Sequence, residues 1–311
     1  MNKETSYPTM RVAYVELLRD VLRGGFNVER RELVTQELAP VSFCVADAVL
    51  HGVPTGLGRK VGPKMMALDG LTHLSGMAWP RLALRTNPNL GRFTNVLSWD
   101  DEADVRDRAN ADIGELFHQG TYGPRLADQM IAMESQLRED PMTRQAVGSL
   151  WCESDREPKY HDRPCATEIQ LMATPWGTLD IYVFMRANDL WTGTCYDVFQ
   201  FGQVQAAMAH VLNVPYGRYH HYATSLHLYA SDMDKAWNLY DHHNNPSIVF
   251  MANERETNGP KWNLLRPGTY PSWIHLQIRF RTIAQALEKQ EPIAAENIVE
   301  EWYIETLGGT S

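Results

Sequence analysis

Three features are scarce in this chain of 311 residues, and each scarcity excludes a class of protein. The four cysteines form no CxxC pair, which argues against a zinc site and a disulfide scaffold. No apolar run reaches about 18 residues, so no membrane span is expected, and the N-terminal residues lack an apolar signal core. Basic residues are too few to offset acidic ones, and a formal charge of -9 argues against broad nucleic-acid binding. We therefore expect a cytoplasmic protein in a reducing compartment.

The overall composition is that of a soluble globular enzyme, with 44% hydrophobic and 22% charged residues. This length suits one large domain or two small ones, and no repeat, low-complexity tract or linker divides the chain. We expect one α+β domain over residues 1–311.

Hydrophobic periodicity predicts both helices and strands. The expected helices are 10–23, 64–75, 123–138 and 197–212, and the expected strands are 33–45, 168–174, 179–187 and 222–229. Gly76 closes the second helix. Pro175-Trp176-Gly177-Thr178 reads as a hairpin turn, and residues 77–120 are the least regular part.

One segment combines the groups that covalent catalysis needs. Cys165 supplies a potential thiolate nucleophile, Arg163 lies two residues before it, and Arg186 follows 21 residues after it. Asp197 adds a carboxylate that could contact a base edge. The alternative is that Cys165 is a small buried hydrophobic residue, as free cysteines commonly are.

Several short sequence patterns follow one another in a fixed order along the chain. They are Arg31 before Thr35-Gln36-Glu37-Leu38, Tyr122-Gly123, Arg144 to Trp151, Pro164-Cys165 with Gln170 five residues later, Arg186-Ala187-Asn188-Asp189 with Gly193, and His227-Leu228-Tyr229. This ordered set resembles the thymidylate synthase superfamily and, within it, the CMP and dCMP 5-hydroxymethylases.

The resemblance implies a role for each matching residue. Catalysis would involve Cys165 as the nucleophile, with Tyr122. Substrate binding would involve the phosphate arginines Arg31, Arg144 and Arg186, the sugar-contacting pair His227 and Tyr229, and Gln170. Asp189 would contact folate. The implied fold is a mixed β-sheet packed with helices, in a homodimer whose active sites are shared and to which Arg144 of the second chain contributes.

The most informative departure is Asp197, where thymidylate synthases have asparagine. An amide can donate to uracil O4 and accept from N3–H, whereas a carboxylate accepts from the N4 amino group of cytosine. It also favours a protonated N3 as charge builds in the covalent adduct. Asp197 therefore indicates cytosine selection, with a helix N-terminal aspartate as the structural alternative.

Other departures affect the chemistry around the nucleophile. Asp69 stands where the family has a catalytic glutamate, and a solvent-facing helix aspartate is the alternative. Asp162 replaces an apolar residue and could admit water, and Ala166 replaces a histidine. Gln145 replaces the second arginine of a pair, and the tail Leu307-Gly308-Gly309-Thr310-Ser311 does not match the family's closing segment.

The doublets His220-His221 and His242-His243 do not predict a metal site, because adjacent strand side chains point to opposite faces. We expect no metal.

The expected activity is 5-hydroxymethylation of a cytidylate with 5,10-methylenetetrahydrofolate and water, through a bond between Cys165 and C6 of the base. The alternatives are a cytidylate 5-methylase, a family member acting on dUMP or UMP, and a non-catalytic nucleotide-binding regulator. Ala187 replaces a family serine and favours CMP over dCMP, although neutral drift explains it equally well. The expected partners are a nucleoside monophosphate, folate and a second copy of the chain, without nucleic acid or a membrane.

Overall fold

The computed structural model describes residues 5–30, 33–51, 61–93, 120–156, 163–243 and 259–308. A six-stranded sheet forms its centre. In their order across the sheet the strands are β1 (Thr5–Tyr7), β4 (Val41–Val45), β9 (Tyr216–Ala223), β7 (Leu179–Met185), β6 (Ala166–Ala173) and β5 (Val147–Ser149). The pairs β1/β4 and β9/β7 are parallel and the other pairs are antiparallel, so the sheet is mixed as expected.

A second sheet has four strands. They are β2 (Phe26–Arg30), β3 (Leu33–Leu38), β10 (Leu226–Tyr229) and β8 (Asn188–Asp189). In this sheet β10 runs antiparallel to β3 and parallel to β8. The pairing places His227 opposite Asp189, so two predicted site residues share one register position.

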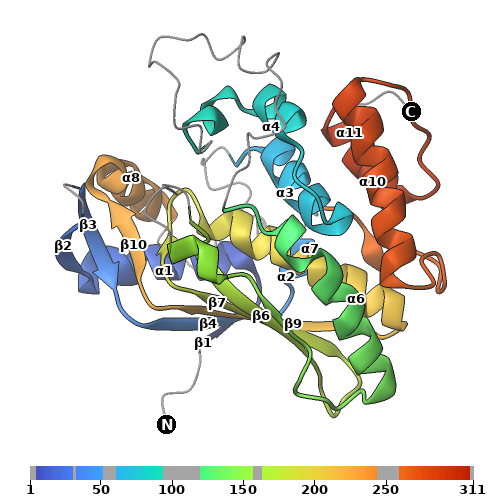
Figure 1. Cartoon of the computed structure of the whole chain (residues 1–311). Helices are drawn as coiled ribbons and strands as arrows, with labels where there is room; N and C mark the ends of the chain where they lie inside the picture. The colour runs from blue at the N-terminus through green and yellow to red at the C-terminus, as the bar shows by residue number, and fades with distance from the viewer. Residues whose placement is uncertain are drawn as a thin grey trace.

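The helices form the second layer of the α+β fold. The α-helices are α1 (Met10–Gly24), α2 (Ala48–His51), α3 (Pro63–Ser75), α4 (Pro80–Thr86), α6 (Gly123–Glu139), α7 (Thr194–Leu212), α8 (Met233–His243), α10 (Trp273–Lys289) and α11 (Ile298–Thr306). Short 3-10 helices are η1 (Pro88–Phe93), η3 (Glu153–Arg156), η4 (Ala230–Asp232) and η6 (Trp262–Leu264). Helices α3, α6, α7, α10 and α11 lie together on one side of the six-stranded sheet (Figure 1).

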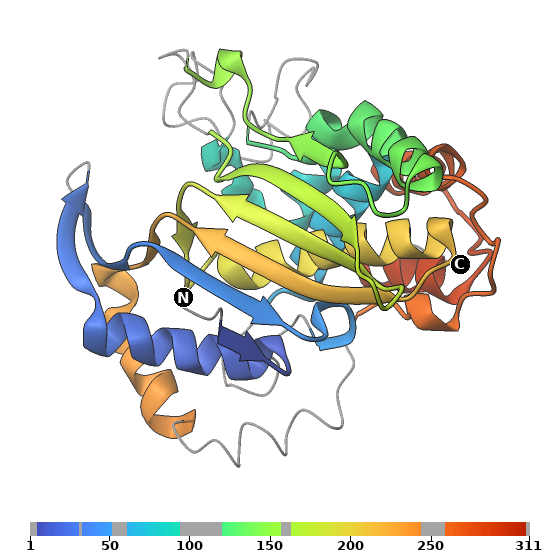
Figure 2. The same cartoon turned by 90° about the horizontal axis from the view of Figure 1, so that it is seen from below.

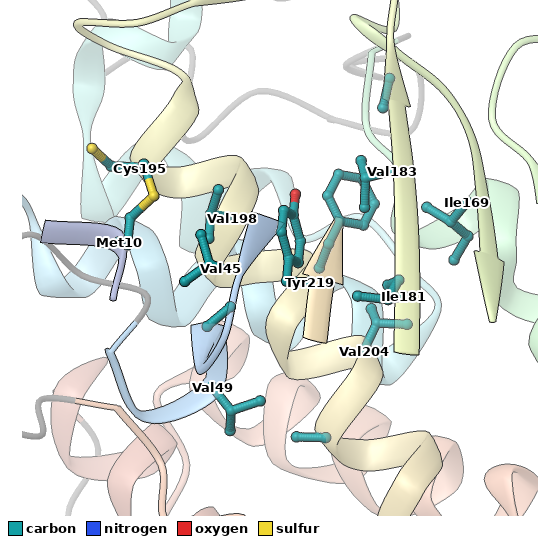
Figure 3. Packing of buried hydrophobic residues seen from close by; sticks show 14 of the residues in the cluster. Met10, Val45, Val49, Ile169, Ile181, Val183, Cys195, Val198, Val204 and Tyr219 are labelled. Atoms are coloured by element: carbon teal, nitrogen blue, oxygen red, sulfur yellow. The ribbon is translucent and has the colours of Figure 1, made fainter. Parts of the chain in front are cut away.

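Helix α7 is the central helix of this layer. It is apolar around almost its whole circumference, which is typical of a helix buried on all sides. Figure 3 shows Cys195, Val198 and Val204 of α7 among side chains from the sheet strands. Because α7 is packed from both sides, the side chains of its first turn are held in fixed positions for the site.

The structure confirms the four predicted helices, with shifts of a few residues at their ends. Gly76 ends α3 with φ of 64°, a left-handed conformation that glycine adopts at little cost. Gly177 has φ of 81° in the turn between β6 and β7, which pair as the predicted hairpin.

Two strand predictions were wrong in extent. Residues 33–45 form two strands, β3 and β4, because Ala39-Pro40 interrupts the run and the two halves enter different sheets. Likewise 222–229 is divided between β9 and β10, and β9 begins earlier, at Tyr216. Within 77–120, α4 and η1 are regular elements that the sequence did not predict.

The other face of the six-stranded sheet points away from the helix layer. Figure 2 is a view from this side, and in the part of the chain that the structure describes no helix covers the central strands. Two stacked ring pairs lie here, Tyr182 with His220 and Phe184 with Tyr222. Their ring centroids are 4.3 Å and 5.0 Å apart, and Tyr222 is exposed. This face is therefore an aromatic surface without a helix over its centre.

Candidate active site

Cys165 lies directly before β6, where the chain enters the central sheet. Its carbonyl accepts a hydrogen bond of 2.8 Å from the backbone N–H of Arg186, which follows β7. Antiparallel pairing of β6 and β7 therefore brings these two residues together across 21 positions. Cys165 is partly buried, whereas Cys44 and Cys195 are fully buried and Cys152 is exposed. The alternative of a simple core cysteine fits Cys44 and Cys195 better than Cys165.

Arg186 packs against the loop that carries the nucleophile. Its Nε donates to the carbonyl of Pro164 at 2.8 Å and its Nη2 to that of Arg163 at 3.1 Å. The same Nη2 is 3.8 Å from the Cys165 sulfur, and the guanidinium lies 5.6 Å from the ring centre of Trp151. A guanidinium beside the sulfur stabilises a thiolate, and its planar fork also suits a phosphate.

Tyr122 contacts the backbone next to the nucleophile. Its hydroxyl oxygen accepts from the backbone N–H of Ala166 at 3.1 Å, and its ring stacks on Phe201. Burial, with the nearby charges of Asp197 and Cys165, raises the pKa of Tyr122 well above its usual value. The hydroxyl therefore stays protonated and lies within the electrostatic reach of both groups.

Asp197 is buried in the first turn of α7, where it makes two short hydrogen bonds. Its Oδ2 accepts from Asn188 Nδ2 at 2.7 Å and its Oδ1 from Gln200 Nε2 at 2.9 Å. Burial raises the pKa of Asp197 to about 7, against the lowering effect of these two donors. Each carboxylate oxygen retains a second lone pair for a base edge. These contacts exceed those of an aspartate that only caps a helix.

Asp69 lies on α3 and faces the same region. Burial, with the charge of Asp197, raises the pKa of Asp69 to about 8. The side chain is partly buried, so the alternative of a solvent-facing helix aspartate does not describe it. A carboxyl group that titrates near neutral pH can both give and accept a proton during a reaction.

Asp189 is the last residue of β8, where the chain turns toward α7. Its Oδ1 accepts from the backbone N–H groups of Trp191 and Thr192 at 2.8 and 3.2 Å, and the Thr192 hydroxyl donates to Oδ2. The loop therefore fixes the carboxylate in place. Its remaining lone pairs match the N–H donors of a folate pterin ring.

His227 and Tyr229 lie on one face of β10, with ring centroids 5.2 Å apart. His227 Nδ1 is 3.4 Å from the Ser225 hydroxyl, which donates to buried Glu37 at 2.9 Å. The hydrogen bond from Arg30 lowers the pKa of Glu37 to about 2, so Glu37 is a carboxylate that only accepts. Because the Ser225 hydroxyl donates its hydrogen to Glu37, it can only accept from His227. The imidazole hydrogen therefore lies on Nδ1, and Nε2 remains an acceptor for a sugar hydroxyl.

Gln170 and Arg144 lie away from this cluster in the same chain. Gln170 is five residues beyond Cys165 on β6, which corresponds to roughly 16 Å along a strand. Its Nε2 donates to the Arg144 carbonyl at 2.8 Å, and Arg144 is exposed. The structure therefore does not bring these two predicted substrate ligands to Cys165 of their own chain.

Arg31, Asp162 and the tail residues 309–311, all named from the sequence, lie outside the described residues. Arg30, which precedes Arg31, ends β2 and forms an ion pair with Glu37 at 2.8 Å.

The sequence missed the residues that support Asp197. Gln200 Oε1 is 3.0 Å from His73 Nε2, and both side chains are buried. No local pattern connects these two residues, which are 127 positions apart. Asn188 belongs to Arg186-Ala187-Asn188-Asp189, but nothing in that pattern predicts its hydrogen bond to Asp197. His73 could have been noticed because it lies four residues after Asp69, on the same face of α3.

No group of histidine, cysteine and acidic residues that could hold a metal occurs among the described residues. The predicted separation of His220 and His221 is observed: His221 is fully buried, whereas His220 lies 3.2 Å from Asp180. None of the helices in the described ranges is long and apolar enough to cross a membrane.

Comparison with known proteins identifies a family for more than half of the chain. The family model described as thymidylate synthase matches residues 71–261. A protein of Bacillus phage SP01, deoxyuridylate hydroxymethyltransferase, is 29% identical to the chain over 240 residues. The alignment covers 70% of this chain and 57% of the phage protein, so the chain spans little more than half the length of that relative.

Proposed function

The chain belongs to the thymidylate synthase family, and we propose that it is a one-carbon transferase that hydroxymethylates C5 of a cytidylate. The single observation that carries the cytosine assignment is Asp197, buried and held by two amide donors where the family has an asparagine. The resemblance implies 5,10-methylenetetrahydrofolate as the one-carbon donor. When bound, it supplies a methylene group at the oxidation level of formaldehyde.

The nucleophile in this proposal is Cys165. Its thiolate attacks C6 of the base, and the electron pair moves to C5, which becomes nucleophilic. Arg186 lies beside the sulfur and against the loop of residues 163–165, so one guanidinium can stabilise the thiolate and orient the substrate phosphate. Tyr122 bonds the backbone next to Cys165 and keeps its hydroxyl proton available.

The proton transfers fall to Asp69 in this scheme. After the one-carbon unit is attached, C5 would lose its hydrogen and tetrahydrofolate would leave, which gives an exocyclic methylene. Water would then add to this methylene. A carboxyl whose pKa is about 8 can move a proton in either direction near neutral pH. Cytidylate, methylenetetrahydrofolate and water would give 5-hydroxymethylcytidylate and tetrahydrofolate, with Cys165 released.

A uridylate substrate is the second candidate, because the phage relative is named a deoxyuridylate hydroxymethyltransferase. The experiment that separates these substrates is incubation of the protein with CMP, dCMP, UMP and dUMP plus methylenetetrahydrofolate. The mass of the product identifies the base and the added group. Dihydrofolate formed one-for-one with product would instead indicate hydride transfer and a 5-methylase.

A regulator that kept the fold and lost the chemistry is also testable. Release of tritium from C5 of labelled CMP or dCMP requires covalent activation of C6. Tight binding of CMP or dCMP without any tritium release from either nucleotide would support the regulator and contradict the cytidylate enzyme.

The sugar preference remains part of the proposal. Ala187 follows Arg186 and lacks the hydroxyl that a family serine would offer to phosphate. We expect a CMP to dCMP ratio of kcat/KM above one that falls in Ala187→Ser. A wild type that favours dCMP would contradict the ribose preference without affecting the cytosine assignment.

We also propose a homodimer that pairs through the aromatic surface of the sheet, defined by Tyr182, Phe184, His220 and Tyr222. The distance of Arg144 from Cys165 within one chain supports shared sites. Mixing inactive Cys165→Ala with inactive Arg144→Ala tests this, because a mixed dimer would contain one site with both residues intact. If mixing restores no activity although subunits exchange, Arg144 does not act across the dimer.

A further inference from the structure

Asp197 can discriminate between bases only in its ionised form. A carboxylate accepts from the N4 amino group of cytosine and from an N3–H formed in the adduct, and it repels the lone pairs of uracil O4. A protonated carboxyl has one donor and one acceptor, and therefore also matches O4 and N3–H of uracil. Any group that keeps Asp197 ionised thus contributes to base selection.

The groups around Asp197 act on its charge in opposite directions. Asp69 on α3 and Asp189 on β8 disfavour a second negative charge, and the burial of Asp197 disfavours it further. Burial, with the negative charge of Asp197, also raises the pKa of two nearby tyrosines, Tyr122 before α6 and Tyr219 on β9, so both hydroxyls are neutral. Opposing these influences are two amide groups, those of Asn188 and Gln200.

The orientation of the Gln200 amide is set by His73. If Gln200 turned its oxygen toward Asp197, its nitrogen would face His73 Nε2, and the histidine hydrogen would move to Nδ1. His73 Nδ1 is buried and has no hydrogen-bond partner among the residues that the structure describes. A bare Nδ1 lone pair is less costly there than an unpaired buried N–H.

The hydrogen of His73 therefore sits on Nε2 and is donated to Gln200 Oε1, which directs Gln200 Nε2 to Asp197. Burial also lowers the pKa of His73 to about 4, so the ring is neutral in the working range. The tilted rings of Tyr122 and Phe201, with centroids 5.9 Å and 5.1 Å from that of His73, hold the imidazole in place.

We propose that His73 and Gln200 are positioning residues that keep Asp197 ionised and thereby make the site reject uridylate. This inference rests on the proposed function, since it explains how that site selects its base. It assigns a role to two residues whose described side-chain hydrogen bonds lead to the site through Asp197.

The test is the pH dependence of base selection. kcat/KM is measured for CMP and UMP from pH 5.5 to 9 in the wild type, His73→Phe, Gln200→Leu and the conservative His73→Gln. His210→Phe is the matched control, because His210 is a partly buried ring at the far end of α7. Circular dichroism and nucleotide binding establish that each variant is folded. If His73→Phe does not fold, Gln200→Leu still tests the proposed role of the His73–Gln200 pair.

In the wild type, turnover of UMP should fall as the pH rises through about 7, where Asp197 ionises. In His73→Phe and Gln200→Leu this fall should move to higher pH, because Asp197 loses a fixed donor. The CMP to UMP ratio at pH 7.5 should drop by roughly tenfold, the effect of one hydrogen bond to a charged group. His73→Gln can still donate to Gln200 and should restore much of the ratio, and His210→Phe should leave it unchanged.

Equal losses for both bases, with the pH profile unmoved in His73→Phe and Gln200→Leu, would overturn the inference and leave these residues a structural role. A wild type that prefers UMP at every pH would instead refute the cytidylate proposal. The two failures are distinguishable, because the first is read from variants against wild type and the second from the wild type alone.

Discussion

Asp197→Asn should stabilise the protein at alkaline pH and destabilise it at acidic pH. The pKa of Asp197 is raised from 3.8 to about 7 by burial. Between these values the unfolded chain has lost the proton and the folded chain still holds it, so stability falls as pH rises. A difference of about three in pKa, at about 1.4 kcal/mol each, gives a penalty of about 4 kcal/mol above pH 7.

The amide escapes this penalty but introduces a mismatch. Both carboxylate oxygens accept from amide donors, and an asparagine would turn its own N–H₂ toward one of them. One such lost hydrogen bond costs about 1–3 kcal/mol. The variant should therefore be more stable than wild type by about 1–3 kcal/mol at pH 8, and less stable near pH 4.5, where the penalty is small.

Urea unfolding followed by tryptophan fluorescence at fixed protein concentration measures both differences. The comparison with wild type is essential, because burial lowers the pKa of His73 and His221 and makes stability rise with pH up to about 6.5. Asp128→Asn, an exposed change on α6, is the matched control and should show no crossing. A variant that is less stable than wild type at every pH would refute the reasoning.

Three further outcomes are expected. Cys165→Ala should abolish C5 tritium release while nucleotide binding survives, and measurable release would contradict its role as nucleophile. Asp155→Asn breaks a buried ion pair with Arg125 (2.6 Å) and should lower the free energy of unfolding by about 3–5 kcal/mol in urea. As a comparison, Lys235→Gln removes the exposed ion pair with Asp232 and should lower the free energy of unfolding by at most about 1 kcal/mol. Equal losses in the two variants would show that burial does not strengthen the Arg125–Asp155 pair. The pKa of Glu37 is held near 2, so the stability gap between wild type and Glu37→Gln should close as pH falls from about 4.5 toward 2; a gap independent of pH would show that the Glu37 charge contributes nothing.

Local signals were enough for the elements that hold the nucleophile. The β6–β7 hairpin follows from alternating residues around Gly177, and the end of α3 from Gly76. The break at Ala39-Pro40 was not recognised, because residues on both sides have strand propensity and only the pairing partners separate them. Helices α10 and α11 also pack by tertiary contacts that the sequence did not reveal.

The site divides in the same way. The residues in short ordered patterns, such as Cys165 and Arg186, are brought together as expected. His73 and Gln200 were missed because a buried polar contact between distant positions leaves no periodic trace in a single sequence. The placement of Gln170 and Arg144 depends on a second chain in the proposal, which no pattern within one chain can specify.

The strand order has a consequence for how the protein is made. β9 lies between β4 and β7, so it joins the N-terminal strands to the hairpin that positions Cys165. Until β9 has left the ribosome, β4 and β7 each present an unpaired edge to other chains. Cys165, Arg186 and the other residues of the proposed proton and nucleophile chemistry are synthesised before the strand that joins the two halves of the sheet. Slower translation of the codons just before β9 would lengthen the time for which these edges are unpaired. Chaperone binding to nascent chains should therefore peak just before Tyr216–Ala223 emerges.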